Sequence, residues 1–377
     1  MNILYLCNEY PPFPHGGIGT AIKELARELA KRGHQITVVG VYPQAREEVD
    51  LHGVRVVRLP RVKTPGISWY LNRQMLKQWV KQEINTSQVD IIEGVDYGGW
   101  LSWTDTRVPS VLRLHGTTFF LSIDLPKHVA FLEKQLEMKA LKSVKNWIGV
   151  SNHVLNQLLE TTKTSLEHQT VIPNPVNTNI FYPTRDAQTS SSEQIILFAG
   201  TVCKRKGALS LAKAANIFLK EFPKARLVFL GKEPLHKGRS IQAAILDIVD
   251  EKLRDRVIFL GNRPHYEVAD WMRKATIFTM PSHAETCGNV WLEAMACELP
   301  VIGSTKTCGP EVVEDGISGL LANPDSPEDV ADKISRIFRN KDLADYLGQN
   351  AKQRVFQYFS HNKVAEKTLD FYQTICN

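Results

Sequence analysis

Residues 276–297 have the sequence TIFTMPSHAETCGNVWLEAMAC, and this stretch decides the fold. The apolar run Thr276–Pro281 predicts a buried strand, and the apolar pattern over Asn289–Cys297 predicts a helix that begins next to Gly288. A strand, a loop and a helix in this order form the repeating unit of a parallel α/β sheet. The glycine-containing turn also presents backbone N–H groups to an anion at the helix start.

Two carboxylates flank the loop between this strand and this helix. Glu285 lies in the loop, and Glu293 is predicted about two turns into the helix, on the side that faces a ligand crevice. Carboxylates accept hydrogen bonds from sugar hydroxyls, whereas helix N–H groups donate to phosphate oxygens. The pattern therefore suits a ligand with a diphosphate and several sugar hydroxyls. Two surface acids are the alternative, but Glu293 lies among apolar residues, where a carboxylate needs a partner.

Strand–helix alternation continues along most of the chain. In the first half the apolar runs are Ile3–Cys7, Gln35–Val41, Val54–Leu59, Val89–Glu93, Val111–Leu114, Trp147–Val150 and Thr170–Pro173. In the second half they are Ile195–Ala199, Leu227–Leu230, Val257–Leu260, Thr276–Pro281 and Pro300–Gly303. Helical patterns lie at Gly17–Arg32, Gly207–Phe222, His265–Lys274, Asn289–Cys297 and Pro327–Arg339. This alternation predicts the α/β class, with parallel sheets and right-handed crossovers.

A chain of 377 residues is too long for one ordinary core, so we predict two Rossmann-like, doubly wound parallel-sheet domains. The segment Pro183–Glu193 has no apolar periodicity and is typical of a linker. We therefore place an N-terminal domain at 1–183 and a C-terminal domain at 184–360. The helical segment 361–377 could pack on either domain, and we assign it to the first. Because ligands bind at the carboxyl ends of the strands in such sheets, two facing domains would form a cleft there.

The composition is that of a globular protein, with 43% apolar and 23% charged residues. A net charge of +6 does not by itself indicate a nucleic-acid partner, and we expect none. Six scattered cysteines without a C-x-x-C pair favour a reducing compartment. The run Met1–Cys7 predicts a strand rather than a signal peptide, and no apolar stretch approaches the roughly 18 residues that span a bilayer. We therefore expect a cytoplasmic protein.

Polar and glycine residues follow two strands of the first half. Gly16 and Gly17 open the first helix, where glycines let the backbone approach a phosphate; an ordinary turn explains them equally well. His115 follows the strand Val111–Leu114 and is a candidate hydrogen-bonding or acid/base group. The alternative is a solvent-facing loop histidine.

A basic cluster follows the strand Ile195–Ala199. The loop from Gly200 to Gly207 contains Lys204, Arg205 and Lys206 and leads into a helix. Cations beside a helix N-terminus form an anion site. A solvated basic turn is the alternative, but the position directly after a parallel strand favours a ligand site.

Taken in order, these motifs resemble those of the retaining glycosyltransferases of family 4, which have the two-domain GT-B fold. The resemblance covers nearly the whole chain. It rests on Gly16-Gly17, His115-Gly116, Ser151, Ile172–Val176, Arg205-Lys206-Gly207, Gly231, Gly261, Pro281-Ser282, Glu285, Glu293–Ala296 and Gly316–Leu320.

The resemblance implies a role for each site residue. Arg205 and Lys206 would bind the donor diphosphate, Glu293 the ribose, and Glu285 the hydroxyls of the donor sugar. His115 would lie beside the anomeric carbon or the 6-position of that sugar, and Asn262 and Arg263 beside the base. The implied catalytic residues are thus His115, Glu285, Arg205 and Lys206. The implied donor-binding residues are Gly16, Gly17, Gly200, Arg205, Lys206, Asn262, Arg263, Glu285, Cys287, Gly288, Asn289, Val290 and Glu293.

The implied reaction moves a hexosyl unit from a UDP- or GDP-sugar to a hydroxyl acceptor. Departure of the diphosphate builds negative charge, which Arg205 and Lys206 would stabilise. Because the chain contains no D-x-D sequence, we expect no metal and no other cofactor. The family retains the anomeric configuration, and a front-face mechanism is expected rather than the two-carboxylate scheme of glycosidases.

The acceptor could be a glycan, a lipid-linked sugar or a small molecule, and in this fold the first domain usually carries it. The segment 55–81 has seven basic residues, no acids and interleaved aromatic residues. It could be an amphipathic helix in peripheral contact with an anionic membrane, or a helix with a solvated basic face. Two rival functions stay open, namely an epimerase or phosphorylase of the same fold and a non-catalytic sugar-nucleotide-binding protein.

Overall fold

The computed structural model describes residues 1–377 except 15, 104–106, 119–130, 185–193 and 237. The chain divides into two compact units. The first comprises Met1–Ser122, Lys127–Pro175 and His361–Asn377, and the second contains Val176–Ser360. The boundary at Pro175 precedes the predicted domain boundary at 183. The predicted linker, Pro183–Glu193, lies mostly outside the described residues, and the domain bounds predicted from the sequence stay a prediction.

In the described part of the first unit, eight strands form one sheet in the order β3-β4-β2-β1-β5-β6-β7-β8. All neighbours pair in parallel except β3 and β4, which are antiparallel. The strands are β1 (Asn2–Leu6), β2 (Gln35–Tyr42), β3 (Arg46–Val49), β4 (Arg55–Pro60), β5 (Ile91–Val95), β6 (Ser110–Leu114), β7 (Asn146–Gly149) and β8 (His168–Val171). Each apolar run predicted in the first half overlaps one of these strands.

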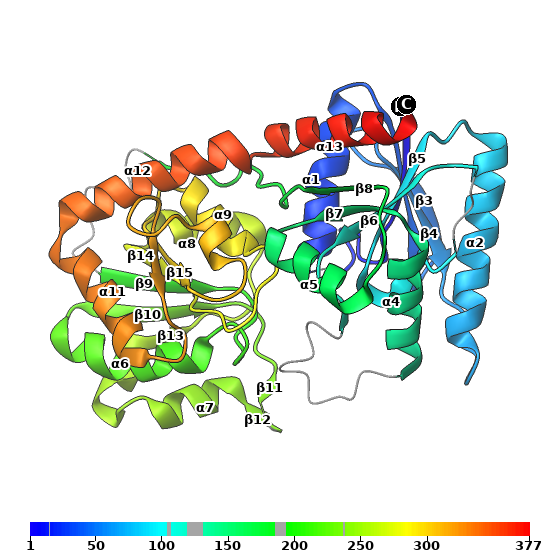
Figure 1. Cartoon of the computed structure of the whole chain (residues 1–377). Coiled ribbons are helices and arrows are strands. Elements are labelled where there is room, and N and C mark those ends of the chain that lie inside the picture. Colours follow the sequence, from blue (N-terminus) through cyan, green and yellow to red (C-terminus); the bar gives the residue numbers. More distant parts are fainter. Residues whose placement is uncertain (15, 104–106, 119–130, 185–193, 237) are drawn as a thin grey trace. The chain divides into compact units, whose positions relative to one another are not determined.

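Helices surround this sheet and supply the rest of the core. They are α1 (Gly17–Lys31), α2 (Ser68–Thr86), the 3₁₀ turn η1 (Tyr97–Gly99), α4 (Phe131–Ser143), α5 (Asn152–Thr162) and α13 (His361–Cys376). The chain returns to the first unit through α13, drawn in red beside α1 in Figure 1. Val364, Ala365 and Tyr372 of α13 are fully buried in one cluster with residues of β1, β2 and α1.

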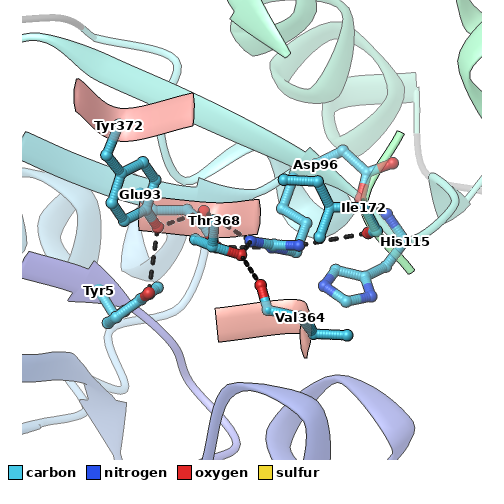
Figure 2. Close-up of polar contacts among 9 residues, drawn as sticks. Tyr5, Glu93, Asp96, His115, Ile172, Val364, Thr368 and Tyr372 are labelled. Atoms are coloured by element: carbon cyan, nitrogen blue, oxygen red, sulfur yellow. Dashed lines mark hydrogen bonds and ion pairs between the residues drawn. The ribbon is translucent and has the colours of Figure 1, made fainter. Parts of the chain in front are cut away.

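A buried polar network joins α13 to the middle of the sheet (Figure 2). Arg113 on β6 forms an ion pair with Glu93 on β5, with 2.7 Å between Nε and Oε1. Tyr372 of α13 donates to Glu93 at 2.6 Å, and its hydroxyl lies 3.0 Å from that of Tyr5 on β1. Thr368, one turn earlier on α13, accepts from Arg113 at 3.4 Å. The terminal helix is therefore tied to three strands by groups that have little access to water.

The second unit contains a sheet of six described strands, all parallel, in the order β13-β10-β9-β14-β15-β16. The strands are β9 (Gln194–Ala199), β10 (Ala225–Leu230), β13 (Val257–Phe259), β14 (Ile277–Thr279), β15 (Val301–Ser304) and β16 (Leu320–Ala322); a short hairpin pairs β11 (Leu235–His236) with β12 (Arg239–Ser240). The helices are α6 (Ala208–Glu221), α7 (Ile241–Ile248), α8 (His265–Lys274), α9 (Asn289–Ala296), α10 (Gly309–Val312), α11 (Pro327–Arg339) and α12 (Lys341–Tyr358), with the 3₁₀ turn η2 (Glu251–Arg256). The predicted α/β class with two parallel-sheet domains is thus confirmed.

The expectation of one basic amphipathic helix over 55–81 is wrong. Residues Arg55–Pro60 form β4, and the helix is α2, Ser68–Thr86. This part of the segment pairs with β2 and β3 as a strand of the sheet. Two of its basic side chains also form ion pairs within the protein. Arg58 is buried and pairs with Glu48, and Arg55 pairs with Glu47 at 2.7 Å.

Candidate functional site

In the second unit, the loop after β9 packs against the loop after β14. Gly207 adopts a left-handed conformation (φ 79°) at the start of α6, and a Cβ there would lie 1.9 Å from the carbonyl oxygen of Pro281. The carbonyl of Arg205 accepts a hydrogen bond from the backbone N–H of His283 at 2.8 Å. Only glycine permits this approach, which brings the basic cluster and the Glu285 loop to the same edge of the sheet.

The predicted cations and Glu285 form one compact cluster. Lys206 Nζ lies 2.7 Å from Glu285 Oε2, and both side chains are largely buried. Arg205 donates from Nη1 to the carbonyl oxygen of Ala284 at 2.9 Å. Burial would raise the pKa of Glu285, but Lys206 and Arg205 outweigh it and hold this pKa below its usual range. The carboxylate is therefore charged at neutral pH and keeps both cations directed toward its loop.

Helix α9 begins at the glycine that the sequence indicates. Gly288 is left-handed (φ 66°), and a Cβ there would lie 2.1 Å from the Trp291 ring. Trp291 Nε1 donates to the carbonyl of Met280 at 3.2 Å, which ties the helix start to the end of β14. Glu293 is buried, as expected, but it lies about one turn into α9 rather than two. Cys287, which precedes Gly288, is also buried, and Asn289 and Val290 lie in the first turn of the helix.

The remaining predicted residues of this unit follow β9 and β13. Gly200 (φ 122°) lies so close to the end of β10 that a Cβ on Gly231 would meet its carbonyl oxygen at 1.8 Å. Asn262 and Arg263 are exposed in the loop after β13. Arg263 donates from Nε to the carbonyl of Leu260 at 3.1 Å. Because all strands are parallel, both loops lie at the same edge of the sheet as the basic cluster; contact of Asn262 and Arg263 with a base stays a prediction.

His115 belongs to the first unit and is buried at the end of β6, so the alternative of a solvent-facing histidine is wrong. Burial first, and the nearby Arg113 second, lower its pKa to about 3. Its imidazole is therefore neutral at physiological pH, which suits a hydrogen-bonding group and not a proton-donating acid. Among the described residues, Nε2 has no hydrogen-bond partner.

Asp96, which the sequence analysis did not identify, positions the His115 turn (Figure 2). Its carboxylate accepts from the backbone N–H of His115 at 2.9 Å and from that of Gly116 at 3.0 Å. Complete burial raises its pKa to about 7, with Glu137 adding to the rise. Asp96 follows β5 directly, so the rule that selected His115, a polar residue at the carboxyl end of a strand, would also have found it.

Gly16 and Gly17 lie at the start of α1, as predicted. The first helical residue is Gly17, and Gly16 occupies the N-cap position. The Glu9 side chain accepts from the backbone N–H of Gly19 at 2.7 Å, so a carboxylate of the protein already lies at this helix start. A role of both glycines in binding a phosphate stays a prediction.

Within the described parts of the chain, no group of three or more His, Cys, Asp or Glu side chains is placed to hold a metal ion. In the same parts, no helix combines the length and the apolar character that crossing a bilayer requires.

Comparison with known proteins identifies relatives for both units. Residues 15–180 match the family model described as Glycosyltransferase Family 4, and residues 184–354 match Glycosyl transferases group 1. N-acetyl-alpha-D-glucosaminyl L-malate synthase of Bacillus anthracis is 25% identical over 96% of this chain and 93% of its own length.

Solved structures share the fold. Sucrose-phosphate synthase of Thermosynechococcus elongatus superposes with a TM-score of 0.84 at 22% identity, over 99% of this chain and 98% of that one. Anabaena HepE in complex with UDP-glucose gives a TM-score of 0.77 at 18% identity, over 99% of this chain and 100% of that one.

Proposed function

Because this chain belongs to glycosyltransferase family 4 and is a glycosyltransferase of the GT-B fold, we propose that it transfers a hexosyl unit from a UDP- or GDP-sugar to a hydroxyl acceptor with retention of configuration. The observation that carries this proposal is the Arg205–Lys206–Glu285 cluster at the strand ends of the second unit. The binding of UDP-glucose by Anabaena HepE supports a nucleotide-sugar donor. Family membership also sets aside the epimerase, phosphorylase and non-catalytic alternatives.

In this proposal the cluster stabilises the departing nucleoside diphosphate. An ammonium group has three N–H donors, and Glu285 engages Lys206 through a single contact of 2.7 Å. As far as the described residues go, the other two donors can bind phosphate oxygens without loss of that contact. Fixed cations in a partly buried site stabilise developing negative charge with little reorganisation, which is the work a divalent metal would otherwise do. The reaction is thus proposed to need no metal or other cofactor.

The same cluster supports a mechanism without a carboxylate nucleophile. The Glu285 carboxylate is paired with Lys206 and hydrogen-bonded by its neighbour's backbone N–H at 3.3 Å. A carboxylate held in this way is a weak nucleophile, because forming a covalent bond would neutralise it and leave the Lys206 ammonium without its counter-charge. We therefore assign Glu285 to the hydroxyls of the donor sugar and Glu293 to the ribose, and we place acceptor attack on the face that the diphosphate leaves.

The proposal is tested by donor binding and turnover. Lys206→Met should weaken binding of UDP or GDP by roughly ten- to a hundredfold, because it removes a charged contact worth about 1.5–3 kcal/mol. Isothermal titration of each nucleotide into wild type and variant measures this loss. Lys220→Met is the matched control, since Lys220 pairs with Asp250 on an exposed surface. Equal nucleotide affinity in all three proteins would contradict the assignment.

A cytoplasmic location and a peripheral membrane contact remain proposals. With Arg55 and Arg58 engaged on β4, the exposed apolar residues that could touch a membrane are Ile67, Trp69 and Tyr70 at the start of α2. The exposed cations of the same segment are Arg61, Lys63 and Lys81. Co-sedimentation with vesicles that contain anionic lipid tests this contact directly.

A further inference from the structure

The first unit contains a pocket of about 480 Å³, within the range of small-molecule sites. It is an open pocket lined by residues from the end of β1, the start of α1, α2, η1 and α4. None of the donor-site residues predicted from the sequence lines it. Its lining includes the charged or aromatic residues Glu9, Arg61, Trp69, Arg73, Tyr97, Trp100 and Glu133.

Three aromatic side chains form much of the pocket wall. Trp69 and Tyr97 are 39% and 41% exposed, so part of each ring is open to solvent. The third ring, Trp100, is covered on one face by the Arg73 guanidinium, 4.5 Å from the ring centroid. Trp69 and Tyr97 therefore present apolar surface that a ligand could cover.

Four charged side chains line the same pocket, two cationic and two anionic. Arg61 and Arg73 are cationic, and Glu9 and Glu133 are anionic. Arg73 donates to the carbonyl of Gly98, but its Nε is buried without a hydrogen-bond partner among the described residues. The guanidinium groups and carboxylates of the pocket thus supply both hydrogen-bond donors and acceptors.

These features discriminate between classes of ligand. An anionic ligand would gain nothing overall from a pocket with two carboxylates and two guanidinium groups. A hydrocarbon chain would cover the rings but would remove charged groups from water without replacing their hydrogen bonds. A saccharide ring has an apolar face for Trp69 or Tyr97, and hydroxyls that donate to carboxylates and accept from guanidinium groups.

We propose that this pocket binds the acceptor of the transfer reaction as a neutral saccharide. The assignment to an acceptor rests on the proposed function, whereas the saccharide class rests on the pocket itself. The sequence leaves three acceptor classes open, and this proposal selects the glycan. It argues against a lipid-linked sugar that is held by its hydrocarbon chain and against a charged small molecule.

Saturation-transfer NMR on the full chain, with saturating UDP or GDP, tests the proposal. The probes are the methyl glycosides of glucose, galactose, mannose and N-acetylglucosamine, compared with glucose 6-phosphate and farnesyl diphosphate. At least one neutral glycoside should bind, and Trp69→Ala and Tyr97→Ala should each weaken it about tenfold. Tyr346→Ala, which removes an aromatic ring that is 50% exposed on α12, is the matched control and should change nothing.

A charge variant separates the ligand classes. Arg61→Gln on the exposed rim should alter binding of a neutral glycoside by less than about threefold, whereas an anionic acceptor would lose roughly tenfold or more. Preferred binding of glucose 6-phosphate or farnesyl diphosphate would overturn the saccharide class. So would the absence of binding by every glycoside, or binding that survives both aromatic variants.

The experiments distinguish failure of the pocket assignment from failure of the proposed function. If glycosides bind through Trp69 and Tyr97 but no nucleotide binds and no sugar is transferred, the donor assignment fails and the saccharide pocket stands. If nucleotides bind and depend on Lys206 while no glycoside binds, the pocket assignment fails and the donor site stands.

Discussion

The His115 side chain is buried, neutral and incompletely hydrogen-bonded, and this combination defines what it can do. Its backbone N–H is held by Asp96 at 2.9 Å, so the position of the turn does not depend on the imidazole. Among described residues, Nε2 is left without a partner. The side chain is thus a neutral hydrogen-bonding group at a position that the backbone already fixes, and its contact with a donor sugar stays a prediction.

The titration of His115 gives a test by pH. Its folded pKa of about 3 lies below the ordinary value of 6.5, so between these values the unfolded chain binds more protons than the folded one. The contribution of His115 to stability is therefore complete above about pH 6.5 and is lost as the pH falls toward 3. His115→Gln should flatten this part of the stability profile, measured by urea unfolding from pH 4 to 8.

Asp96 contributes a slope of opposite sign, because its raised pKa favours folding at lower pH. This contribution cancels when wild type and variant are compared, since Asp96 bonds the backbone and not the imidazole of His115. The exposed His52 provides the control substitution, His52→Gln. Identical profiles for wild type and His115→Gln would mean that His115 titrates like an exposed histidine.

At the scale of elements, helix α13 depends on the buried Glu93–Arg113 pair. Both side chains are at most 2% exposed, and Tyr372 completes the hydrogen bonding of the carboxylate. A buried pair of this kind adds little net stability over an apolar pair, but loss of one partner strands the other charge. The network therefore fixes the position of α13 on the sheet but adds little to the total stability of the protein.

Arg113→Met should lower the free energy of unfolding by about 3–5 kcal/mol, because the Glu93 carboxylate would remain buried without its partner. The double variant Glu93→Leu with Arg113→Met should recover a large part of this loss. Urea unfolding followed by tryptophan fluorescence measures both. Lys363→Met removes an exposed ion pair on the same helix and should have little effect. A double variant as unstable as the single one would show that the loss comes from packing.

Two of the elements that sequence reasoning missed, β3 and α12, share a physical cause. Strand β3 has the sequence REEV and no apolar run, since its place at the sheet edge leaves its side chains largely in water. Helix α12 buries only Leu347, Gly348, Ala351 and Val355 over 18 residues, too few for a clear apolar stripe. Periodicity reports burial, so elements with little buried surface do not produce it.

At the scale of the whole molecule, the proposed chemistry takes its positive charge from side chains and not from a bound ion. Turnover of the UDP- or GDP-sugar should therefore be unchanged after treatment with EDTA, and added Mn²⁺ should not restore Lys206→Met. Rates measured with chelator, without chelator and with Mn²⁺ decide this. Strict dependence on Mn²⁺ would contradict the metal-free proposal.

The sequence by itself determined the α/β class and most of the strands, and it indicated the candidate site residues that follow them. It could do so because buried parallel strands are continuous apolar runs, and ligand-binding residues follow such runs. Only the tertiary structure decided which of these groups meet, because the pairing of Lys206 with Glu285 and of His115 with Asp96 joins residues distant in the chain. It also decided that Arg55 and Arg58 belong to a strand, and that rings from α2 and η1 enclose one pocket. Contacts of this kind depend on the packing of the elements, which local patterns do not encode.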